Sequence, residues 1–326
     1  MRKGHAVSQP LGTQRALVDI LLATCNGERY LPALLDSLLD QSHQDWRLLV
    51  GDDASTDATL DILETYRPRL AGRLQVLPAP ARQGVVRNFE RLMRASQRDG
   101  AASFMSFCDQ DDVWLPSKLA TLLAAMRQLK ASAGAQTPCL VHCDLRVVDE
   151  ALALIHPSFI RHQRYDPARC SATALLSVNQ VTGCAMMIDA ALLELALPIP
   201  DAALMHDWWC ALLAARAGLR FVDEPLVLYR QHRANQLGAK GRGAWARLVR
   251  LCRDAPGVIR RVRGLGTGTR AQAGALATRL AERGLDNAWV RDYLAWREAP
   301  LWRRVMNYRS HYTGPELDRC ARLWWW

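Results

Sequence analysis

Short apolar runs alternate with helical patterns along the first two-thirds of this 326-residue chain, and no other feature restricts its fold as much. The first four runs lie at 17–23, 47–51, 74–77 and 103–108. Between the first two, Leu31, Leu34 and Leu38 recur at the spacing of a helix that buries one face. Strands that alternate with helices in this way pair into a largely parallel sheet. We therefore predict an α/β fold with a Rossmann-like, mixed but mostly parallel sheet that is flanked by helices.

The chain beyond the fourth run continues this alternation as far as Tyr229. Helices are predicted at 115–129, with Pro116 in the first turn, and at 206–217, and strands at 140–148 and 220–229. After Tyr229 the sequence becomes rich in Arg, Ala, Gly and Trp, and it shows no further strand pattern. We predict three parts: a flexible tail at 1–15, a main domain at 16–238 and a helical extension at 239–326.

Polar clusters follow three of the predicted strands, at the point where each strand ends. They lie at 24–28, 51–57 and 109–112. Ligands bind an open parallel sheet outside the carboxyl ends of its strands, so these clusters are expected to share one rim. The acids at 53–57 have a second interpretation, because Asp, Ser and Thr also cap the helix that follows.

Three carboxylates crowd the cluster after the fourth strand: Asp109, Asp111 and Asp112. Such charges repel one another unless a cation or solvent relieves them. Hard oxygen ligands suit Mg²⁺ or Mn²⁺, which usually bind through one or two carboxylates plus substrate phosphates. The segment therefore predicts a divalent metal that holds a nucleoside diphosphate group. The alternative is a solvated loop that caps the helix beginning at Pro116.

Three segments together resemble glycosyltransferase family 2. They read VDILLATCNG at 18–27, GDDASTD at 51–57 and CDQDDVW at 108–114. The resemblance spans about residues 18–238, and it implies a GT-A type domain that performs inverting, metal-dependent transfer from a nucleotide-sugar donor.

The resemblance also implies a role for particular residues at the donor site. Thr24, Asn26 and Asp53 are expected to hold the nucleotide base, while Asp109 lies near the ribose and Asp111 binds the metal. Gly84 and Asn88 match a looser family pattern near the nucleotide. A turn followed by a helix start explains that last pair equally well.

The catalytic base implied by the resemblance is Asp207, in the run MHDWW at 205–209. The family more often carries a Glu-Asp pair where this chain has His206 and Asp207, which leaves the role of His206 open. A carboxylate at a helix start can remove the acceptor hydroxyl proton, although it can also simply cap the helix. Trp208 is a candidate for stacking on a sugar ring, with core packing as the alternative.

The run YRQHRAN at 229–235 closes the last strand and resembles bacterial rhamnosyltransferases. His232 is expected to contact the metal or the diphosphate, and Arg230 to stabilise the charge of the leaving diphosphate. A solvated basic loop is the alternative. Thr182, between Asn179 and Gly183, resembles the acceptor-side segment of the family. The resemblance implies a sugar such as rhamnose and a glycan or lipid-linked acceptor in the synthesis of cell-surface polysaccharide such as O-antigen.

The C-terminal extension carries the positive charge of the chain. Residues 239–326 contain 18 Lys and Arg against 7 acids, so the rest of the chain is near neutral despite the overall charge of +10. Two patterns of aromatic and apolar residues recur at helical spacing, one beginning at Trp245 and the other formed by Trp289, Tyr293 and Trp296. They favour either peripheral contact with an anionic membrane or packing on the main domain. The glycine-rich stretch at 264–268 is interpreted as a flexible connector.

Composition limits the setting and the rival functions. The nine cysteines lack paired CxxC spacing, which argues against a disulfide framework and favours a reducing cytoplasm. The N-terminus lacks an apolar signal core and no run is long enough to span a bilayer, so membrane association would be peripheral, at the inner face. The rival readings are a nucleotidyltransferase and a basic nucleic-acid-binding protein; no nucleic-acid-reading motif is recognisable, which makes the second the weaker of them.

Overall fold

The first strand, β1 (Val18–Thr24), is apolar at nearly every position because both of its faces are buried in the centre of a sheet. It pairs in parallel with β2 (Trp46–Asp52) on one side and with β4 (Phe104–Asp109) on the other. The structure is a computed structural model that describes residues 16–165, 167, 171–232, 255–300 and 302–303. Within this part of the chain, nine strands form one sheet in the order β3-β2-β1-β4-β8-β6-β9-β5, with β7 paired to β6.

The strands that follow β1 along the chain are β2 (Trp46–Asp52), β3 (Leu74–Pro78), β4 (Phe104–Asp109), β5 (Val113–Trp114), β6 (Leu140–Val148), β7 (Leu154–His156), β8 (Met186–Asp189) and β9 (Leu219–Arg230). Parallel pairs join β3, β2, β1 and β4, and another joins β6 to β9. The remaining pairs, which involve β5, β7 and β8, are antiparallel. The predicted mixed, mostly parallel sheet is confirmed, and the three short strands are those that the sequence patterns missed.

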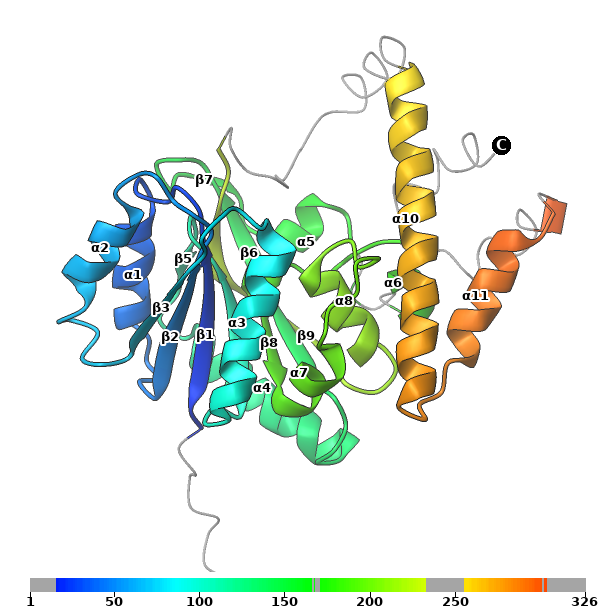
Figure 1. The fold of residues 1–326 in the computed structure, drawn as a ribbon, viewed down its shortest axis with the longest axis horizontal. Coiled ribbons are helices and arrows are strands. Elements are labelled where there is room, and N and C mark those ends of the chain that lie inside the picture. The colour runs from blue at the N-terminus through cyan, green and yellow to red at the C-terminus, as the bar shows by residue number, and fades with distance from the viewer. Residues whose placement is uncertain (1–15, 166, 168–170, 233–254, 301, 304–326) are drawn as a thin grey trace, which may run out of the picture.

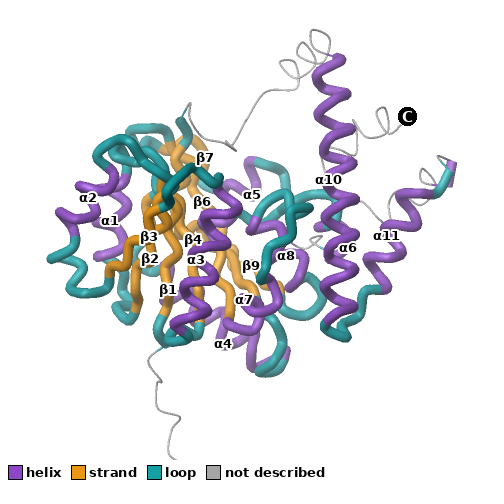
Figure 2. Tube along the Cα trace, viewed as in Figure 1, coloured by secondary structure: helices purple, strands orange, loops and turns teal. Residues whose placement is uncertain are grey.

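Helices cover both faces of the sheet, as Figure 2 shows. They are α1 (Leu31–Leu39), α2 (Thr59–Tyr66), α3 (Val85–Asp99), α4 (Lys118–Ala133), α5 (Phe159–His162), α6 (Ala172–Leu175), α7 (Ala190–Ala196), α8 (His206–Ala214), α10 (Ala255–Glu282) and α11 (Ala288–Glu298), with a short 3-10 turn, η2 (Gly183–Ala185). Alternate residues of β1 enter opposite cores. Ile20 and Leu22 pack with α1 and α4, whereas Leu21 packs with α3, α7 and α8.

Three predicted helix boundaries are wrong. The helix expected at 115–129 instead runs from Lys118 to Ala133. The Lys118 amide donates to the Leu115 carbonyl and closes a turn ahead of the helix, and the Thr121 amide donates to the carbonyl of the N-cap residue, Ser117, as the first bond of the helix. Pro116 thus precedes the helix and does not occupy its first turn. The helix expected to reach residue 217 ends at Ala214, and the Gly218 amide then bonds back to the Ala214 carbonyl.

The glycine-rich stretch at 264–268 is not a connector, because it lies inside α10. A Cβ at Gly268 would come within 2.8 Å of a Leu204 methyl group, so the missing side chain allows α10 to approach the main domain closely. Figure 1 shows α10 and α11 together at the end of the molecule opposite α1 and α2. The proposed boundary near residue 238 and the aromatic stripe at Trp245 lie outside the described residues.

The described helices of the extension share a core with the main domain. Leu276 of α10 and Trp289, Tyr293 and Trp296 of α11 are buried in the cluster that also contains α3, α7 and α8. The Tyr293 hydroxyl lies 3.2 Å from Ser177 Oγ, which joins α11 to the segment before η2. For α11, the packing interpretation of the aromatic stripe is therefore correct.

Truncating this shared core is expected to destabilise the whole protein. Leu276→Ala removes a fully buried side chain from α10 and should cost about 2–5 kcal/mol of unfolding free energy. Leu285→Ala, at a position that is 42% exposed, should change stability by less than about 0.5 kcal/mol. Chemical denaturation of both variants measures the difference, and equal stabilities would mean that α10 does not belong to the core.

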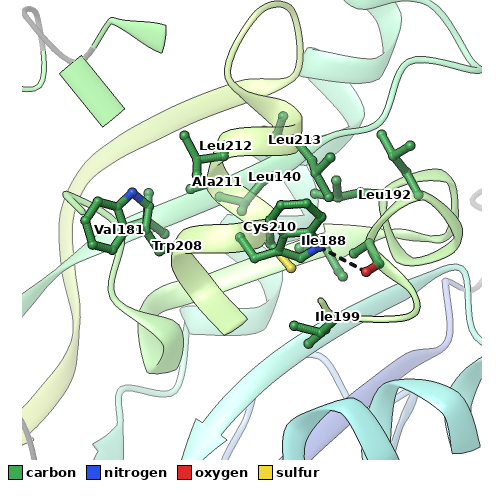
Figure 3. Packing of buried hydrophobic residues seen from close by; sticks show 14 of the residues in the cluster. Leu140, Val181, Ile188, Leu192, Ile199, Trp208, Cys210, Ala211, Leu212 and Leu213 are labelled. Atoms are coloured by element: carbon green, nitrogen blue, oxygen red, sulfur yellow. Dashed lines mark hydrogen bonds between the residues drawn. The ribbon is translucent and has the colours of Figure 1, made fainter. Parts of the chain in front are cut away.

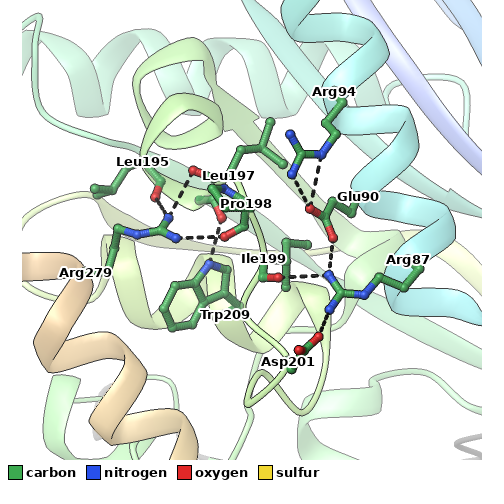
Figure 4. A network of polar contacts seen from close by, with 11 residues as sticks. Arg87, Glu90, Arg94, Leu195, Leu197, Pro198, Ile199, Asp201, Trp209 and Arg279 are labelled. Carbon is green, nitrogen blue, oxygen red and sulfur yellow. Dashed lines mark hydrogen bonds and ion pairs between the residues drawn. The ribbon is translucent and has the colours of Figure 1, made fainter.

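Arginines from two helices hold the segment between α7 and α8, as drawn in Figure 4. Arg279 of α10 donates to the carbonyls of Leu195, Leu197 and Pro198 at 2.6, 3.2 and 2.8 Å. From α3, Arg87 donates to the Ile199 carbonyl at 2.9 Å and pairs with Glu90 and Asp201. This segment leads directly into α8, so the bonds from Arg279 and Arg87 to its backbone carbonyls hold the start of α8 in place.

Candidate active site

A cavity of about 1010 Å³ opens where β1 and β4 end, between the β1 loop, the start of α3 and the start of α8. Its wall includes ten of the residues that the sequence singled out: Thr24, Asn26, Asp53, Gly84, Asn88, Asp109, Asp111, Thr182, Asp207 and His232. The expected common rim is therefore present. The cavity is large enough for a nucleotide with an attached sugar, because small-molecule sites commonly measure roughly 300–1,000 Å³.

Hydrogen bonds join the ends of β1 and β2 next to the cavity. Thr24 Oγ1 donates to Asp52 Oδ1 at 3.0 Å, and Asp52 also accepts the Ser55 amide at 3.0 Å. Asn26 takes φ of 53°, and its side-chain oxygen accepts the Thr56 amide at 2.8 Å. Asp52 is thus a structural residue of the turn, and the two candidate base-binding residues are held in place by that turn.

Asp53 fixes the opposite wall. Its two carboxylate oxygens accept the backbone amides of Gln83 and Gly84 at 2.7 and 2.9 Å. Gly84 has φ of 85°, a conformation that side chains disfavour, and it directly precedes α3. The capping alternative for the acids at 53–57 is wrong for Asp53, which is remote from α2, but Asp57 Oδ1 accepts the amide of Thr59, the first residue of α2, at 3.1 Å.

Asn88 ties α3 to the end of β2. Its Nδ2 donates to the Gly51 carbonyl at 2.6 Å, and its Oδ1 accepts from Arg91 at 2.9 Å. A Cβ at Gly51 would lie 2.3 Å from Asn88 Oδ1, so this contact requires glycine. Asn88 lines the cavity, but its bonds to Gly51 and Arg91 serve the fold.

The acidic segment presents two of its carboxylates to the cavity and buries the third. Asp111 Oδ2 lies 2.7 Å from His232 Nε2, which joins residues 121 positions apart. Asp112 is fully buried, and its Oδ1 accepts the Arg230 amide at 3.2 Å. Burial, followed by the charges of Asp111 and Asp207, raises the pKa of Asp109 to about 7.

These groups fit a hard divalent cation. Asp111 offers carboxylate oxygens and His232 an imidazole nitrogen, and both face the cavity at hydrogen-bond distance from one another. Burial is the main cause of the raised pKa of Asp109, and the charges of Asp111 and Asp207 raise it further. A cation at Asp111 and His232, with phosphate oxygens as further ligands, would relieve that charge.

Arg230 and Trp208 do not line the cavity, which corrects the sequence prediction for both. The Arg230 guanidinium is buried, donates to the Asp111 carbonyl at 2.8 Å and to the Glu150 carbonyl, and stacks over the Tyr30 ring. It therefore holds the backbone around the acidic segment.

The Trp208 indole is 6% exposed, and it donates to the Leu175 carbonyl at 2.6 Å. Figure 3 shows it among the buried side chains, beside Val181. An indole needs a partner for its N–H when it is buried, and α6 supplies one here. Core packing is therefore the correct interpretation of Trp208.

Asp207 lies at the start of α8 with three hydrogen-bond donors around it. Its Oδ2 accepts the Gly183 amide at 2.9 Å, and its Oδ1 accepts from Asn179 Nδ2 at 3.1 Å and from the Trp208 amide at 2.6 Å. Burial raises the pKa of Asp207 to about 6, against the opposing effect of these donors. The helix has no side-chain cap, since Met205 occupies the N-cap position, so simple capping does not explain this carboxylate.

His206 is neutral and enclosed. Its ring stacks on Phe89 with 3.9 Å between ring centroids, and burial lowers its pKa to about 3. Both ring nitrogens are buried without a hydrogen-bond partner in the described part of the chain. A Cβ at Gly183 would lie 2.9 Å from His206 Nε2, so the His206 ring packs directly against the Gly183 backbone, beside Asp207.

This close packing makes Gly183 sensitive to substitution. Gly183→Ala would push the new methyl group against His206 and displace the amide that bonds to Asp207. We expect kcat to fall by about 10–100-fold, since losing the equivalent of about 1.4–2.8 kcal/mol in a transition-state interaction has that effect. Steady-state kinetics checks this, with Gly274→Ala, where a Cβ meets nothing within 4 Å, as the control. Equal kcat values for both variants would contradict it.

Several cavity residues escaped the sequence reasoning. Gln110 clamps the β1 loop, since its Oε1 accepts the Cys25 amide at 2.8 Å and its Nε2 donates to the Cys25 carbonyl at 3.1 Å. Its position between two predicted site carboxylates was a usable signal. Arg82 directly precedes the segment that contains Gly84, and Tyr30 follows the first polar cluster, so both could have been found. Glu150 carried no local signal, because the β6–β7 turn alone brings it to the cavity.

Comparisons with known proteins identify the family and the fold. A model of the family described as "Glycosyl transferase family 2" matches residues 19–187, more than half of the chain. The dTDP-rhamnosyl transferase RfbG of Shigella flexneri is 27% identical over 67% of this chain and 74% of its own length. The putative teichuronic acid biosynthesis glycosyltransferase TuaG of Bacillus subtilis is 34% identical over 35% of this chain and 43% of its own.

Among solved structures, the mannosyltransferase PcManGT from Pyrobaculum calidifontis, in complex with GDP-Man and Mn²⁺, aligns over 93% of this chain and 83% of its own. The TM-score is 0.51 and the identity 17%, so this likeness concerns the fold. TarS of S. aureus with UDP-GlcNAc aligns over 81% of this chain and 72% of its own, with a TM-score of 0.50 and 15% identity. The chain belongs to glycosyl transferase family 2 and is a glycosyltransferase of GT-A fold.

Proposed function

We propose that the protein is an inverting transferase that moves rhamnose from thymidine-diphosphate rhamnose to a glycan or lipid-linked acceptor, in the synthesis of cell-surface polysaccharide. The observation that carries this proposal is that one cavity contains both the proposed metal ligands, Asp111 and His232, whose side chains lie 2.7 Å apart, and a separate buried carboxylate, Asp207. The similarity to the dTDP-rhamnosyl transferase RfbG supports the donor.

Each side of the cavity has its own task in this proposal. Thr24, Asn26, Asp53, Gly84 and Asn88 line the side where the nucleotide would lie. Asp109 would contact the ribose, and Thr182 the acceptor. Asp111 and His232 would hold Mg²⁺ or Mn²⁺, which when bound offsets the negative charge that develops on the leaving diphosphate.

Asp207 would remove the acceptor proton. Its raised pKa makes it a better base than an exposed carboxylate, and the donors from Gly183 and Asn179 fix its orientation. The proton would pass from the acceptor hydroxyl to an Asp207 oxygen while the acceptor oxygen bonds to the anomeric carbon of the donor, and the bond from that carbon to the diphosphate would break with its electron pair leaving on the diphosphate. Inversion follows if the acceptor attacks from the side opposite the diphosphate.

The test is a panel of nucleotide sugars assayed with and without Mn²⁺ by release of free nucleoside diphosphate and by the anomeric configuration of the product. Metal-dependent release from thymidine-diphosphate rhamnose, with inversion, would support the proposal. Preference for another nucleotide sugar would overturn the donor, and retention of configuration would overturn the mechanism. Release of inorganic diphosphate would indicate nucleotidyl transfer.

The pH dependence follows from the raised pKa of Asp207. A base must be ionised to accept a proton, so kcat/KM should fall as the pH drops through about 6. Asn179→Ala removes a hydrogen bond that favours the charged carboxylate, and it should therefore move this acidic limb to higher pH. A pH–rate profile of both proteins with saturating Mn²⁺ measures the limb, and a limb that Asn179→Ala leaves in place would exclude Asp207 as its source.

Peripheral contact with the inner face of an anionic membrane remains part of the proposal. No helix in the described part of the chain is long and apolar enough to cross a bilayer. The aromatic side chains of α11 face the core, so they do not support membrane contact. Support within the described residues comes from Trp302, which is 65% exposed and directly precedes the basic Arg303. Sedimentation with vesicles that contain anionic lipid tests this, and equal recovery with neutral vesicles would contradict it.

A further inference from the structure

Two arginines line the cavity within the part of the chain that the structure describes, Arg29 and Arg82. A departing diphosphate is stabilised by fixed cations as well as by a metal, and the buried Arg230 guanidinium does not face the cavity, because it bonds to backbone carbonyls. Arg82 directly precedes Gln83, whose amide bonds to Asp53, so Arg82 stands on the side proposed for the nucleotide. Arg29 is the other cation, and its neighbours show where it lies.

The Tyr30 ring connects Arg29 with the proposed metal ligands. The Arg29 guanidinium carbon lies 5.0 Å from the centroid of this ring, and the centroid of the His232 ring lies 4.9 Å from the same point. His232 Nε2 in turn reaches Asp111. These contacts place Arg29 on the metal side of the cavity, where the diphosphate of the donor would lie.

Glu150 pairs with Arg29 although 121 positions separate them in the sequence. Arg29 Nη2 lies 2.7 Å from Glu150 Oε2, and both residues line the cavity. The Glu150 carbonyl accepts from Arg230, so the backbone of the β6–β7 turn is fixed next to this pair. The two side chains are 66% and 41% exposed, and an exposed ion pair holds its partners only weakly. Arg29 can therefore exchange Glu150 for a stronger partner.

A diphosphate is such a partner. It offers several oxygens and more than one negative charge, and a guanidinium binds phosphate groups through two parallel N–H donors. Glu150 has the same sign of charge as the diphosphate, so the two compete for Arg29. The structure thus shows Arg29 bonded to a carboxylate that a donor can displace.

We propose that Arg29 binds the diphosphate of the donor, and that Glu150 holds Arg29 at the cavity wall until the donor replaces it. The exchange breaks the ion pair between Arg29 and Glu150 and forms one between Arg29 and the diphosphate. Arg29 then offsets charge on the leaving group, which is the role that the sequence predicted for Arg230. The proposal rests on the nucleotide-sugar site of the proposed function.

The experiment compares thymidine diphosphate with thymidine as ligands of wild type, Arg29→Met, Glu150→Gln and the double variant, all at saturating Mn²⁺. Calorimetry gives the affinity for thymidine diphosphate, and competition against it gives the affinity for thymidine. The pair of Arg69 and Asp36 is the matched control, because it is also exposed and its atoms lie 2.8 Å apart. Arg69 likewise lies over an aromatic ring, that of Tyr66, and neither member of the pair lines the cavity. Arg69→Met and Asp36→Asn should therefore bind both ligands as wild type does.

Arg29→Met should weaken the binding of thymidine diphosphate by about 10–100-fold, as the loss of a hydrogen bond to a charged group does. Thymidine has no phosphate, so its affinity should stay within about twofold of wild type. Glu150→Gln should tighten the binding of thymidine diphosphate by about 2–5-fold, because the competing carboxylate is gone. Adding Glu150→Gln to Arg29→Met should give a smaller gain, since no arginine then has to be released. The thermal unfolding midpoints should stay near that of wild type, because the ion pair is exposed.

Equal losses for thymidine and thymidine diphosphate in Arg29→Met, or no loss for either, would overturn the proposal. Weaker binding of thymidine diphosphate to Glu150→Gln would also overturn it, as would a gain from Glu150→Gln that is as large without Arg29 as with it. If wild type prefers another nucleoside diphosphate, the proposed donor is wrong, and the same comparison with that nucleotide and its nucleoside decides the role of Arg29. If wild type binds no nucleoside diphosphate, this proposal and the proposed function both fail.

Discussion

Asp207→Asn should lower kcat by roughly 10²–10⁴-fold, the usual contribution of a general base. The substitution keeps the size of the side chain, and one amide oxygen can still accept the Gly183 amide. Donor binding should therefore change little, because the carboxylate lies on the acceptor side of the proposed site. Single-turnover transfer and calorimetric donor binding measure the two effects separately.

A matched control is available in the loop before α8. Asp201 is an exposed carboxylate that pairs with Arg87, and its side chain is 96% exposed. Asp201→Asn should keep kcat within about twofold of wild type, since surface substitutions away from special features have small effects. Full transfer activity in Asp207→Asn would show that another group accepts the proton, and the assignment would be abandoned.

Asp111→Asn should abolish most Mn²⁺-dependent transfer, with a loss of at least about 100-fold at ordinary metal concentrations. Loss of a group that only supports a metal ligand already costs roughly 10–100-fold, and the ligand itself should matter more. The variant also loses the charged partner that lies 2.7 Å from His232 Nε2. Calorimetric titration of Mn²⁺ with thymidine diphosphate present should show the same loss without any turnover.

His232→Gln separates the two proposed ligands. Glutamine can still offer an oxygen to the metal, so the loss of transfer activity in His232→Gln should be smaller than in Asp111→Asn. Raising the Mn²⁺ concentration should restore part of the lost activity. Asp223→Asn, on the exposed stretch of β9, serves as the control and should behave as wild type. Metal-dependent transfer that survives Asp111→Asn unchanged would place the metal elsewhere.

Local pattern was sufficient for much of the fold. The central strands β1, β2 and β4 are buried on both faces, so each appears in the sequence as an apolar run with a polar cluster at its end. The short strands β5, β7 and β8 were missed, because two to four residues are too few to show a period. The glycine-rich stretch within α10 was misread for a related reason: the close contact that Gly268 makes depends on Leu204, which is distant in the sequence.

The sequence by itself determined which strand ends carry polar groups and which segment concentrates carboxylates, because these follow from residue order and the period of each element. Only the tertiary structure decided which of those groups meet. The pairing of β5 with β9 brings His232 to Asp111, and the packing of α8 against η2 brings Gly183 to Asp207. It also decided that Trp208 and Arg230 turn away from the cavity toward carbonyls of other segments. Such partners are fixed by sheet register and helix docking, which depend on contacts between residues far apart in the chain and leave no local period to read.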